Sequence, residues 1–390
     1  MHVIHVITRL IVGGAQENTI ASVLGLLKKP DLRVELISGG SPGREGSLAS
    51  CFDSIPNLLT TLPELVRPIH PWKDCLAWRK LTRLFQERRP LIVHTHSGKA
   101  GFLGRLAAAK ANIPIIIHTV HGPSFGPFQG RIANCVFRSA ERSAGKVTSH
   151  FVTVADAMTK QYLAAGIGRS AIYTKIFSGF PLEPFSNATN NPVLRAKCGI
   201  DSSAVVIGKI ARLFKLKGHD DLFAVAPDLI RRFPHVKFLL VGDGPWRDRF
   251  EARVRASGLE GHIIFTGLVP PAEIPQYVGI MDVLVHLSLR EGLPRALPQA
   301  LAASRPVVAY DCDGAREVCL DGKTGFLLQS GDLAGLRKSL GCLIGDPALR
   351  ERLGMQGQQF VRERFSVERM VDDLHALYQR LAMRNQPPQT

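Results

Sequence analysis

Short apolar runs alternate along the chain with longer stretches in which apolar residues recur at helical spacing. Runs rich in Val, Ile and Leu that are separated by helices are typical of strands buried in a parallel sheet. The pattern therefore predicts an α/β fold made of two doubly wound parallel-sheet domains. The predicted strands are 2–7, 34–38, 92–96, 115–119 and 151–154 in the first half, and 205–210, 237–241, 263–266, 283–287 and 306–309 in the second.

A stretch rich in Gly and Pro, 177–185, interrupts this alternation near the middle of the chain, and a polar stretch follows it. A chain of 390 residues is too long for one ordinary domain. We therefore predict a first domain over 1–178 and a second over 179–366. Segment 367–390 is expected to hold a helix over 367–383, a candidate for returning to the first domain, and a polar, frayed tail. The helix keeps its apolar residues near helical spacing, at Met370, Leu374, Leu377 and Leu381.

Composition narrows the class of protein. Hydrophobic residues make up 45% of the chain, which supports large cores, yet no apolar run reaches the roughly 18 residues of a membrane span. The first residues read as a buried strand and lack the layout of a signal peptide. The seven cysteines include no C-x-x-C pair, which argues against a zinc site or a redox pair. Reduced thiols in the cytosol fit this odd count, and we expect a cytoplasmic protein.

The net charge of +16 is unevenly distributed. Residues 1–176 hold 22 Lys and Arg against 10 Asp and Glu, whereas 177–390 hold 27 against 23. A basic first half could attract an anionic membrane or an acidic substrate, or serve only solubility. No motif for nucleic-acid binding is present, so nucleic acid is not an expected partner. Candidates for a membrane-facing surface are the basic residues Arg79, Lys80, Arg83, Arg88, Arg89, Arg131, Arg138, Arg142 and Lys146, with Leu76, Leu81, Leu84 and Phe85 among them; a core-facing stripe explains the apolar four equally well.

The most informative stretch is 288–309. It places Glu291 and Gly292 on a tight turn after an apolar strand, and a helix is expected to begin at Pro294. The amino end of a helix suits a phosphate, and a turn carboxylate can accept hydrogen bonds from sugar hydroxyls. The stretch thus favours a nucleotide-sugar site over an ordinary strand–turn–helix.

Two cations follow another predicted strand. Arg212 and Lys217 lie beyond the carboxyl end of 205–210, where open sheets bind ligands, and could grip a diphosphate. A solvated basic loop is the alternative. Further strand-end turns contain Gly242 and Val269, which could hold a base through backbone contacts, and the pair Gly13 and Gly14, where backbone can approach a ligand closely. His121 follows strand 115–119, whereas His94 and His96 are expected to be packing residues.

Nearly the whole chain resembles the family 4 retaining glycosyltransferases, which have two Rossmann-like domains facing a central cleft (the GT-B fold). The motifs that carry the resemblance are Gly13-Gly14, His121-Gly122, Arg212 with Lys217-Gly218, Gly242-Asp-Gly-Pro245, Glu291-Gly-Leu-Pro294, Pro306-Val-Val-Ala309, Asp313-Gly-Ala-Arg-Glu-Val318, Gly322-Lys-Thr-Gly-Phe326 and Gly331-Asp332.

The resemblance implies transfer of a sugar from a nucleotide diphosphate sugar, expected to be a UDP-sugar, to an acceptor hydroxyl on a glycan or lipid-linked acceptor of the cell envelope. By the same resemblance, Arg212 and Lys217 neutralise the diphosphate, and Glu291 with the backbone of Gly292 and Leu293 orients the sugar. His121 faces the reacting sugar from the first domain. Because Arg212 and Lys217 could neutralise the diphosphate, neither a metal nor a cofactor other than the donor is expected.

One position departs from the family pattern. The family usually has a second glutamate eight residues after the first, where this chain has Gln299. Gln keeps an acceptor oxygen but loses the charge, so we expect it still to hold the ribose. The departure leaves two alternatives open, a UDP-N-acetylglucosamine 2-epimerase and a catalytically silent protein that binds sugar nucleotides.

Overall fold

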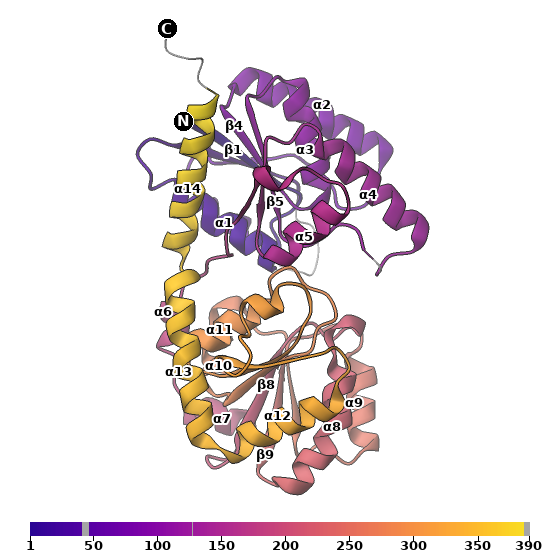
Figure 1. Ribbon diagram of the computed structural model, residues 1–390, viewed down its shortest axis with the longest axis vertical. Coiled ribbons are helices and arrows are strands. Elements are labelled where there is room, and N and C mark those ends of the chain that lie inside the picture. The colour runs from indigo at the N-terminus through magenta and orange to yellow at the C-terminus, as the bar shows by residue number, and fades with distance from the viewer. Residues whose placement is uncertain (41–46, 127, 386–390) are drawn as a thin grey trace. The chain divides into compact units, whose positions relative to one another are not determined.

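The computed structural model describes residues 1–40, 47–126 and 128–385. The chain forms two compact units, Met1–Phe180 with Val367–Thr390, and Pro181–Ser366 (Figure 1). The first unit therefore ends two residues beyond the predicted boundary at 178, and the C-terminal segment belongs to it. The predicted polar tail lies, from residue 386 onward, outside the described residues.

The first unit contains a seven-stranded parallel sheet in the order β3-β2-β1-β4-β5-β6-β7. Its strands are β1 (His2–Ile7), β2 (Arg33–Ser38), β3 (Leu59–Thr61), β4 (Ile92–His96), β5 (Ile115–Val120), β6 (His150–Thr153) and β7 (Tyr173–Lys175). Its helices are α1 (Gly14–Leu26), α2 (Pro71–Arg88), α3 (Gly98–Lys110), α4 (Arg131–Gly145), α5 (Asp156–Ala164) and α14 (Val367–Arg384).

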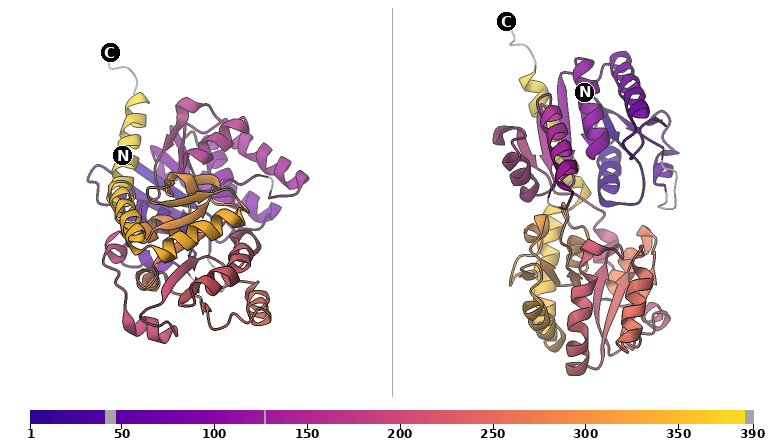
Figure 2. Two further views of the ribbon diagram at one scale, coloured as in Figure 1. Left: turned by 60° about the horizontal axis from the view of Figure 1, so that its bottom comes forward. Right: turned by 90° about the vertical axis from the view of Figure 1, so that its right-hand side faces the viewer.

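Alternating side chains of β1 fill two cores, one on each face of this sheet. Val3 and Ile7 pack with residues of α1 and α14, whereas Ile4 and Val6 pack with residues of α2 and α3. Successive strand residues point to opposite faces, so a strand buried on both faces is apolar along most of its length; the buried exception in β1 is His5. The views in Figure 2 show helices on both sides of the sheet.

Helix α14 lies against α1 although more than 300 residues separate them in the chain. Its Met370 sulfur accepts hydrogen bonds from the Asn18 side chain at 3.0 Å and from the Gly179 backbone at 3.2 Å. Gly25 of α1 lacks a side chain at the contact, where a Cβ atom would lie 2.3 Å from Val371. The last helix is thus an integral part of the first unit's core.

The second unit contains a six-stranded parallel sheet in the order β10-β9-β8-β11-β12-β13. Its strands are β8 (Val205–Ile210), β9 (Val236–Val241), β10 (Ile263–Gly267), β11 (Val283–His286), β12 (Val307–Tyr310) and β13 (Gly325–Leu328). Its helices are α6 (Glu183–Ser186), α7 (Pro192–Lys197), α8 (His219–Arg232), α9 (Arg247–Ala256), α10 (Ile274–Gly279), α11 (Ala296–Ala302), α12 (Leu333–Gly345) and α13 (Pro347–Arg364).

The predicted fold class is confirmed, since both units are parallel sheets flanked by helices. Among the described residues no helix is long and apolar enough to cross a bilayer. All seven cysteines are unpaired.

Candidate functional site

Two loops that follow β8 and β11 are joined at the carboxyl end of the second sheet. The backbone N–H of Leu289 donates to the carbonyl of Leu216 at 2.9 Å. Gly218 has a φ of 66°, and a Cβ atom there would lie 2.1 Å from the carbonyl oxygen of Leu287. The close approach therefore needs glycine at this position for both backbone conformation and space.

An ion pair connects the same two loops. The Lys217 ammonium lies 2.5 Å from Glu291 Oε1, and the two side chains are 25% and 18% exposed. Burial pushes the pKa of Glu291 upward, but the neighbouring His286 and Lys217 outweigh burial and hold that pKa well below its usual range. Burial lowers the pKa of His286, whose Nε2 lies 3.3 Å from Glu291 Oε1. The His286 ring and the Lys217 ammonium thus both face the Glu291 carboxylate, which is ionised at neutral pH.

The backbone around Glu291 is held by the segment after β12. The Glu291 N–H donates to Asp313 Oδ2 at 2.7 Å, and the Gly314 N–H donates to the Gly292 carbonyl at 3.0 Å. The prediction that a helix begins at Pro294 is wrong, because α11 begins two residues later, at Ala296. The residues between 291 and 295 form a bend stabilised by contacts with another loop.

Arg212 lies on the same loop as Lys217, exposed, with its guanidinium carbon 5.8 Å from the centre of the Phe214 ring. The turn after β9 packs against this loop, since a Cβ atom on Gly242 (φ 134°) would lie 2.4 Å from the Ala211 carbonyl oxygen. Val269 is buried just after β10, beside a backbone bridge between Gly242 and Gly267. Four neighbouring strand ends thus meet at one edge of the second sheet, where ligands bind in open α/β sheets.

Several buried polar side chains near these loops were missed by the sequence analysis. Lys209 Nζ, His219 Nδ1 and Ser288 Oγ have no hydrogen-bond partner within the described part of the chain. Burial, with a smaller contribution from Lys217, lowers the pKa of Lys209 to about 7. Burial likewise lowers the pKa of His219 to about 2. The signal available in the sequence was a lysine inside the apolar run 205–210.

Three predicted site residues belong to the first unit. Gly13 precedes α1, and its carbonyl accepts from the Glu17 N–H at 2.9 Å; Gly14 is exposed at the first position of the helix. His121 follows β5, and its Nε2 lies 3.1 Å from His96 Nδ1. Burial lowers the pKa of His121 to about 4, so the ring is neutral at neutral pH. The other eight predicted residues belong to the second unit, namely Arg212, Lys217, Gly242, Val269, Glu291, Gly292, Leu293 and Gln299.

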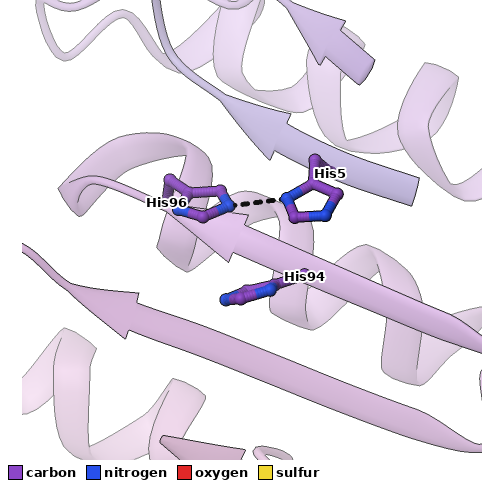
Figure 3. Close-up of side chains that lie close together, drawn as sticks. All are labelled: His5, His94 and His96. Atoms are coloured by element: carbon purple, nitrogen blue, oxygen red, sulfur yellow. Dashed lines mark hydrogen bonds between the residues drawn. The ribbon is translucent and has the colours of Figure 1, made fainter. Parts of the chain in front are cut away.

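Among the described residues, His5, His94 and His96 form a group of three potential metal ligands, remote in sequence from the predicted site (Figure 3). One nitrogen of each ring lies within 4.8 Å of the others, and the rings are stacked or tilted, with centroids 4.5–5.2 Å apart. Both nitrogens of His94 are within hydrogen-bond distance of Tyr378 and Thr119. The group is better described as a hydrogen-bonded cluster than as a metal centre.

Comparison with protein families assigns both halves of the chain. A family profile described as "Glycosyltransferase Family 4" matches residues 12–174. A second profile, described as "Glycosyl transferases group 1", matches residues 190–360. Each match falls within one of the two structural units.

Curated relatives are similar over most of their length. The GDP-mannose-dependent alpha-(1-6)-phosphatidylinositol monomannoside mannosyltransferase of Mycolicibacterium smegmatis is 28% identical, over 83% of this chain and 92% of its own. The UDP-Gal:alpha-D-GlcNAc-diphosphoundecaprenol alpha-1,3-galactosyltransferase of Escherichia coli is 26% identical, over 81% and 82%. The putative glycosyltransferase EpsD of Bacillus subtilis is 26% identical, over 82% and 84%.

Solved structures share the fold. Anabaena HepE in complex with UDP superimposes with a TM-score of 0.81 at 21% identity, covering 97% of this chain and 100% of HepE. Sucrose-phosphate synthase of Thermosynechococcus elongatus gives a TM-score of 0.80 at 18% identity, covering 98% of this chain and 100% of that one.

Proposed function

Because the chain belongs to the family 4 glycosyltransferases with the GT-B fold, we propose that it transfers a sugar from a UDP-sugar to an acceptor hydroxyl with retention of anomeric configuration. The observation that carries the proposal is the Lys217–Glu291 ion pair, which joins two strand-end loops with Arg212 alongside. It offers cations for a diphosphate next to an ionised acceptor for sugar hydroxyls.

The proposed roles in the second unit follow from charge and position. Arg212 and Lys217 stabilise the negative charge that develops on the diphosphate leaving group, with the guanidinium able to donate two parallel hydrogen bonds. Glu291 accepts hydrogen bonds from the donor sugar, and its orientation is fixed by the Asp313 contact to its backbone. The remaining contacts to the donor are proposed to come from the backbone of Gly242, Val269, Gly292 and Leu293 and from the Gln299 side chain.

Gly13, Gly14 and His121 are the first unit's proposed contribution. Backbone at the glycine pair can approach a ligand closely. A neutral His121 has one donor and one acceptor nitrogen, which suits a sugar hydroxyl better than an ionised ring would. The two cations in the second unit lead us to propose that no divalent metal is needed.

The donor and acceptor classes are supported by what related proteins are named for. HepE has been solved with UDP and with UDP-glucose, and the E. coli relative is named for UDP-Gal. The M. smegmatis relative is named for GDP-mannose, so GDP-sugars are the competing donors. Names such as diphosphoundecaprenol and capsular polysaccharide favour a lipid-linked or glycan acceptor in cell-envelope synthesis.

We also propose that the first unit contacts an anionic membrane from the cytoplasmic side. Two of the predicted apolar residues do not serve this role, because Leu81 and Phe85 are fully buried in the core under α2. The exposed apolar residues are others, on α2, just before it and on α4, and basic side chains accompany them. They are Ile69 (70% exposed), Trp72 (79%), Leu76 (44%), Ile132 (83%) and Val136 (55%).

Incubation with a panel of UDP- and GDP-sugars, with and without lipid-linked and glycan acceptors, tests the function. Retaining transfer is supported if nucleotide release depends on an acceptor and the product has the same anomeric configuration as the donor sugar. A changed sugar without an acceptor would indicate a 2-epimerase, and binding without turnover would indicate a silent protein. Activity that disappears in EDTA and returns with Mn²⁺ would overturn the metal-free proposal.

A further inference from the structure

A continuous chain of hydrogen-bonding side chains crosses the first unit from α14 to His121. Tyr378 on α14 places its hydroxyl 2.5 Å from His94 Nδ1 and 3.3 Å from His5 Nε2. His5 Nδ1 lies 2.9 Å from His96 Nε2, the contact drawn in Figure 3, and His96 Nδ1 lies 3.1 Å from His121 Nε2. A branch leads from His94 Nε2 to Thr119 Oγ1 at 2.6 Å.

The sheet explains why these side chains meet. His5 lies on β1, while His94 and His96 lie on the neighbouring β4, where residues two apart share a face. Register pairs His5 directly with His94, and β4 pairs His96 with Thr119 at the end of β5, just before His121. Tyr378 reaches this group of side chains from α14, where its hydroxyl contacts His94 and His5.

The four histidines of this hydrogen-bonded row, His5, His94, His96 and His121, are neutral at neutral pH. Burial lowers the pKa of His5 to about 3 and the pKa of His121 to about 4. It also takes the pKa values of His94 and His96 well below their usual range. A neutral imidazole carries one N–H donor and one acceptor nitrogen. A ring that accepts a hydrogen bond at one nitrogen must therefore donate at the other.

Each neutral ring carries one N–H proton and the Tyr378 hydroxyl carries one, so only two placements of these protons satisfy every hydrogen bond of the row. If Tyr378 donates to His94, it must accept from His5 Nε2, and then His5, His94, His96 and His121 all carry their proton on Nε2. If Tyr378 donates to His5, it must accept from His94 Nδ1, and then the same four rings all carry their proton on Nδ1. A mixed set would bring two donors or two acceptors face to face at a buried contact, which is costly.

We propose that Tyr378 is a positioning residue that couples the tautomers of His5, His94, His96 and His121, and thereby decides whether His121 offers an acceptor or a donor at its Nδ1. His121 has its Nε2 occupied by His96, so Nδ1 is the atom left for a ligand. That this ligand is a hydroxyl of the donor sugar rests on the proposed function; the coupling of the tautomers does not.

Nitrogen-15 spectra of histidine-labelled protein, assigned by single His→Gln variants, test the coupling without reference to activity. The four rings are expected to share one tautomer, all Nε2–H or all Nδ1–H. A set in which any of the four differs would overturn the proposal.

Tyr378→Phe removes the hydroxyl and keeps the ring. It is expected to shift the 15N signals of His121, beyond the residues that touch Tyr378, and to lower kcat about fivefold, the scale of one hydrogen bond, with the donor KM changed less. Tyr173→Phe is the matched control, because the Tyr173 hydroxyl donates to the Ile167 carbonyl and takes no part in the row of histidines. Unchanged His121 signals in Tyr378→Phe would refute the coupling, whereas shifted signals in a protein that transfers no sugar would keep the coupling and reject the proposed function.

Discussion

Lys209 is the residue with the clearest energetic consequence. It is 1% exposed on β8, and its amine has no hydrogen-bond partner among the described residues. The unfolded chain keeps a proton on this amine up to about its ordinary pKa of 10.5, whereas burial in the folded chain lowers that pKa to about 7. Between these pH values the unfolded state binds more protons than the folded state, so the free energy of unfolding falls as the pH drops from 10.5. The loss of stability caused by burying this amine reaches its full size below about pH 7.

Lys209→Met should therefore raise the free energy of unfolding by removing the penalty. The gain at pH 7 should exceed the gain at pH 9 by about 2 kcal/mol, because the penalty shrinks as the pH approaches the unfolded pKa. Urea unfolding at both pH values measures this, with Lys338→Met at an exposed position of α12 as control. An equal gain at the two pH values would contradict a neutral, buried amine.

Gln299 is the residue at which the chain departs from its family. Its amide can accept from one ribose hydroxyl and donate to another oxygen. Gln299→Glu should change donor affinity by no more than about 1.5 kcal/mol, the scale of one hydrogen bond. Donor titration of both proteins checks this. Onset of activity in the variant, from an inactive parent, would instead favour the silent-protein alternative.

Sequence could assign the residues at strand ends but not the polar residues beneath them. Arg212, Lys217 and Glu291 follow predicted strands, so their shared edge follows from parallel topology. Lys209 and His286 lie within strands, and which face a strand residue takes depends on packing. The Lys217–Glu291 pairing joins residues 74 positions apart, and no local pattern specifies it.

At the level of elements, the ten predicted strands are all present, with ends shifted by at most one residue. The three missed strands, β3, β7 and β13, contain three or four residues each and lie at sheet edges. An edge strand has one paired neighbour and is only partly buried, and β3 (Leu-Thr-Thr) and β7 (Tyr-Thr-Lys) accordingly lack the continuous apolar run of a central strand. In β13 the apolar run is only three residues long, from Phe326 to Leu328. The amphipathic pattern of 367–383 predicted α14 well because all four of its apolar positions face the core.

Leu374→Ala tests whether α14 stabilises the first unit. Leu374 is 3% exposed and belongs to the core formed with α1 and the sheet. Truncation should cost about 2–5 kcal/mol of unfolding free energy through lost burial and the cavity left behind. Urea unfolding measures the loss, with the partly exposed Asp373→Ala as control; its i,i+4 ion pair with Arg369 is at the surface, so the control should change stability by about 0.5 kcal/mol or less. A negligible effect of Leu374→Ala would mean that the helix is not part of the core.

At the scale of the molecule, the +16 net charge and the exposed apolar residues of the first unit bear on membrane contact. Binding to anionic vesicles is expected at low salt and should fade as salt rises, because each basic residue near the surface contributes roughly 1 kcal/mol that is screened beyond about 10 Å. Cosedimentation with neutral and anionic vesicles across a salt series measures this.

Trp72→Ala should weaken vesicle binding, whereas Val193→Ala, equally exposed on the second unit, should not. The absence of binding to anionic vesicles at low salt would reject the membrane proposal.

Binding of the donor diphosphate by Arg212 and Lys217 is the central feature of the proposed function. The direct measurement is calorimetric titration of UDP, paired with donor turnover, for the parent, Arg212→Ala, Lys217→Ala and the exposed control Lys338→Ala. Each site variant should fold normally, bind UDP more weakly and turn over on the order of a hundredfold more slowly or worse, since a cation facing developing charge is worth about 3–4 kcal/mol. Parent-like UDP affinity and turnover in both site variants would contradict the account.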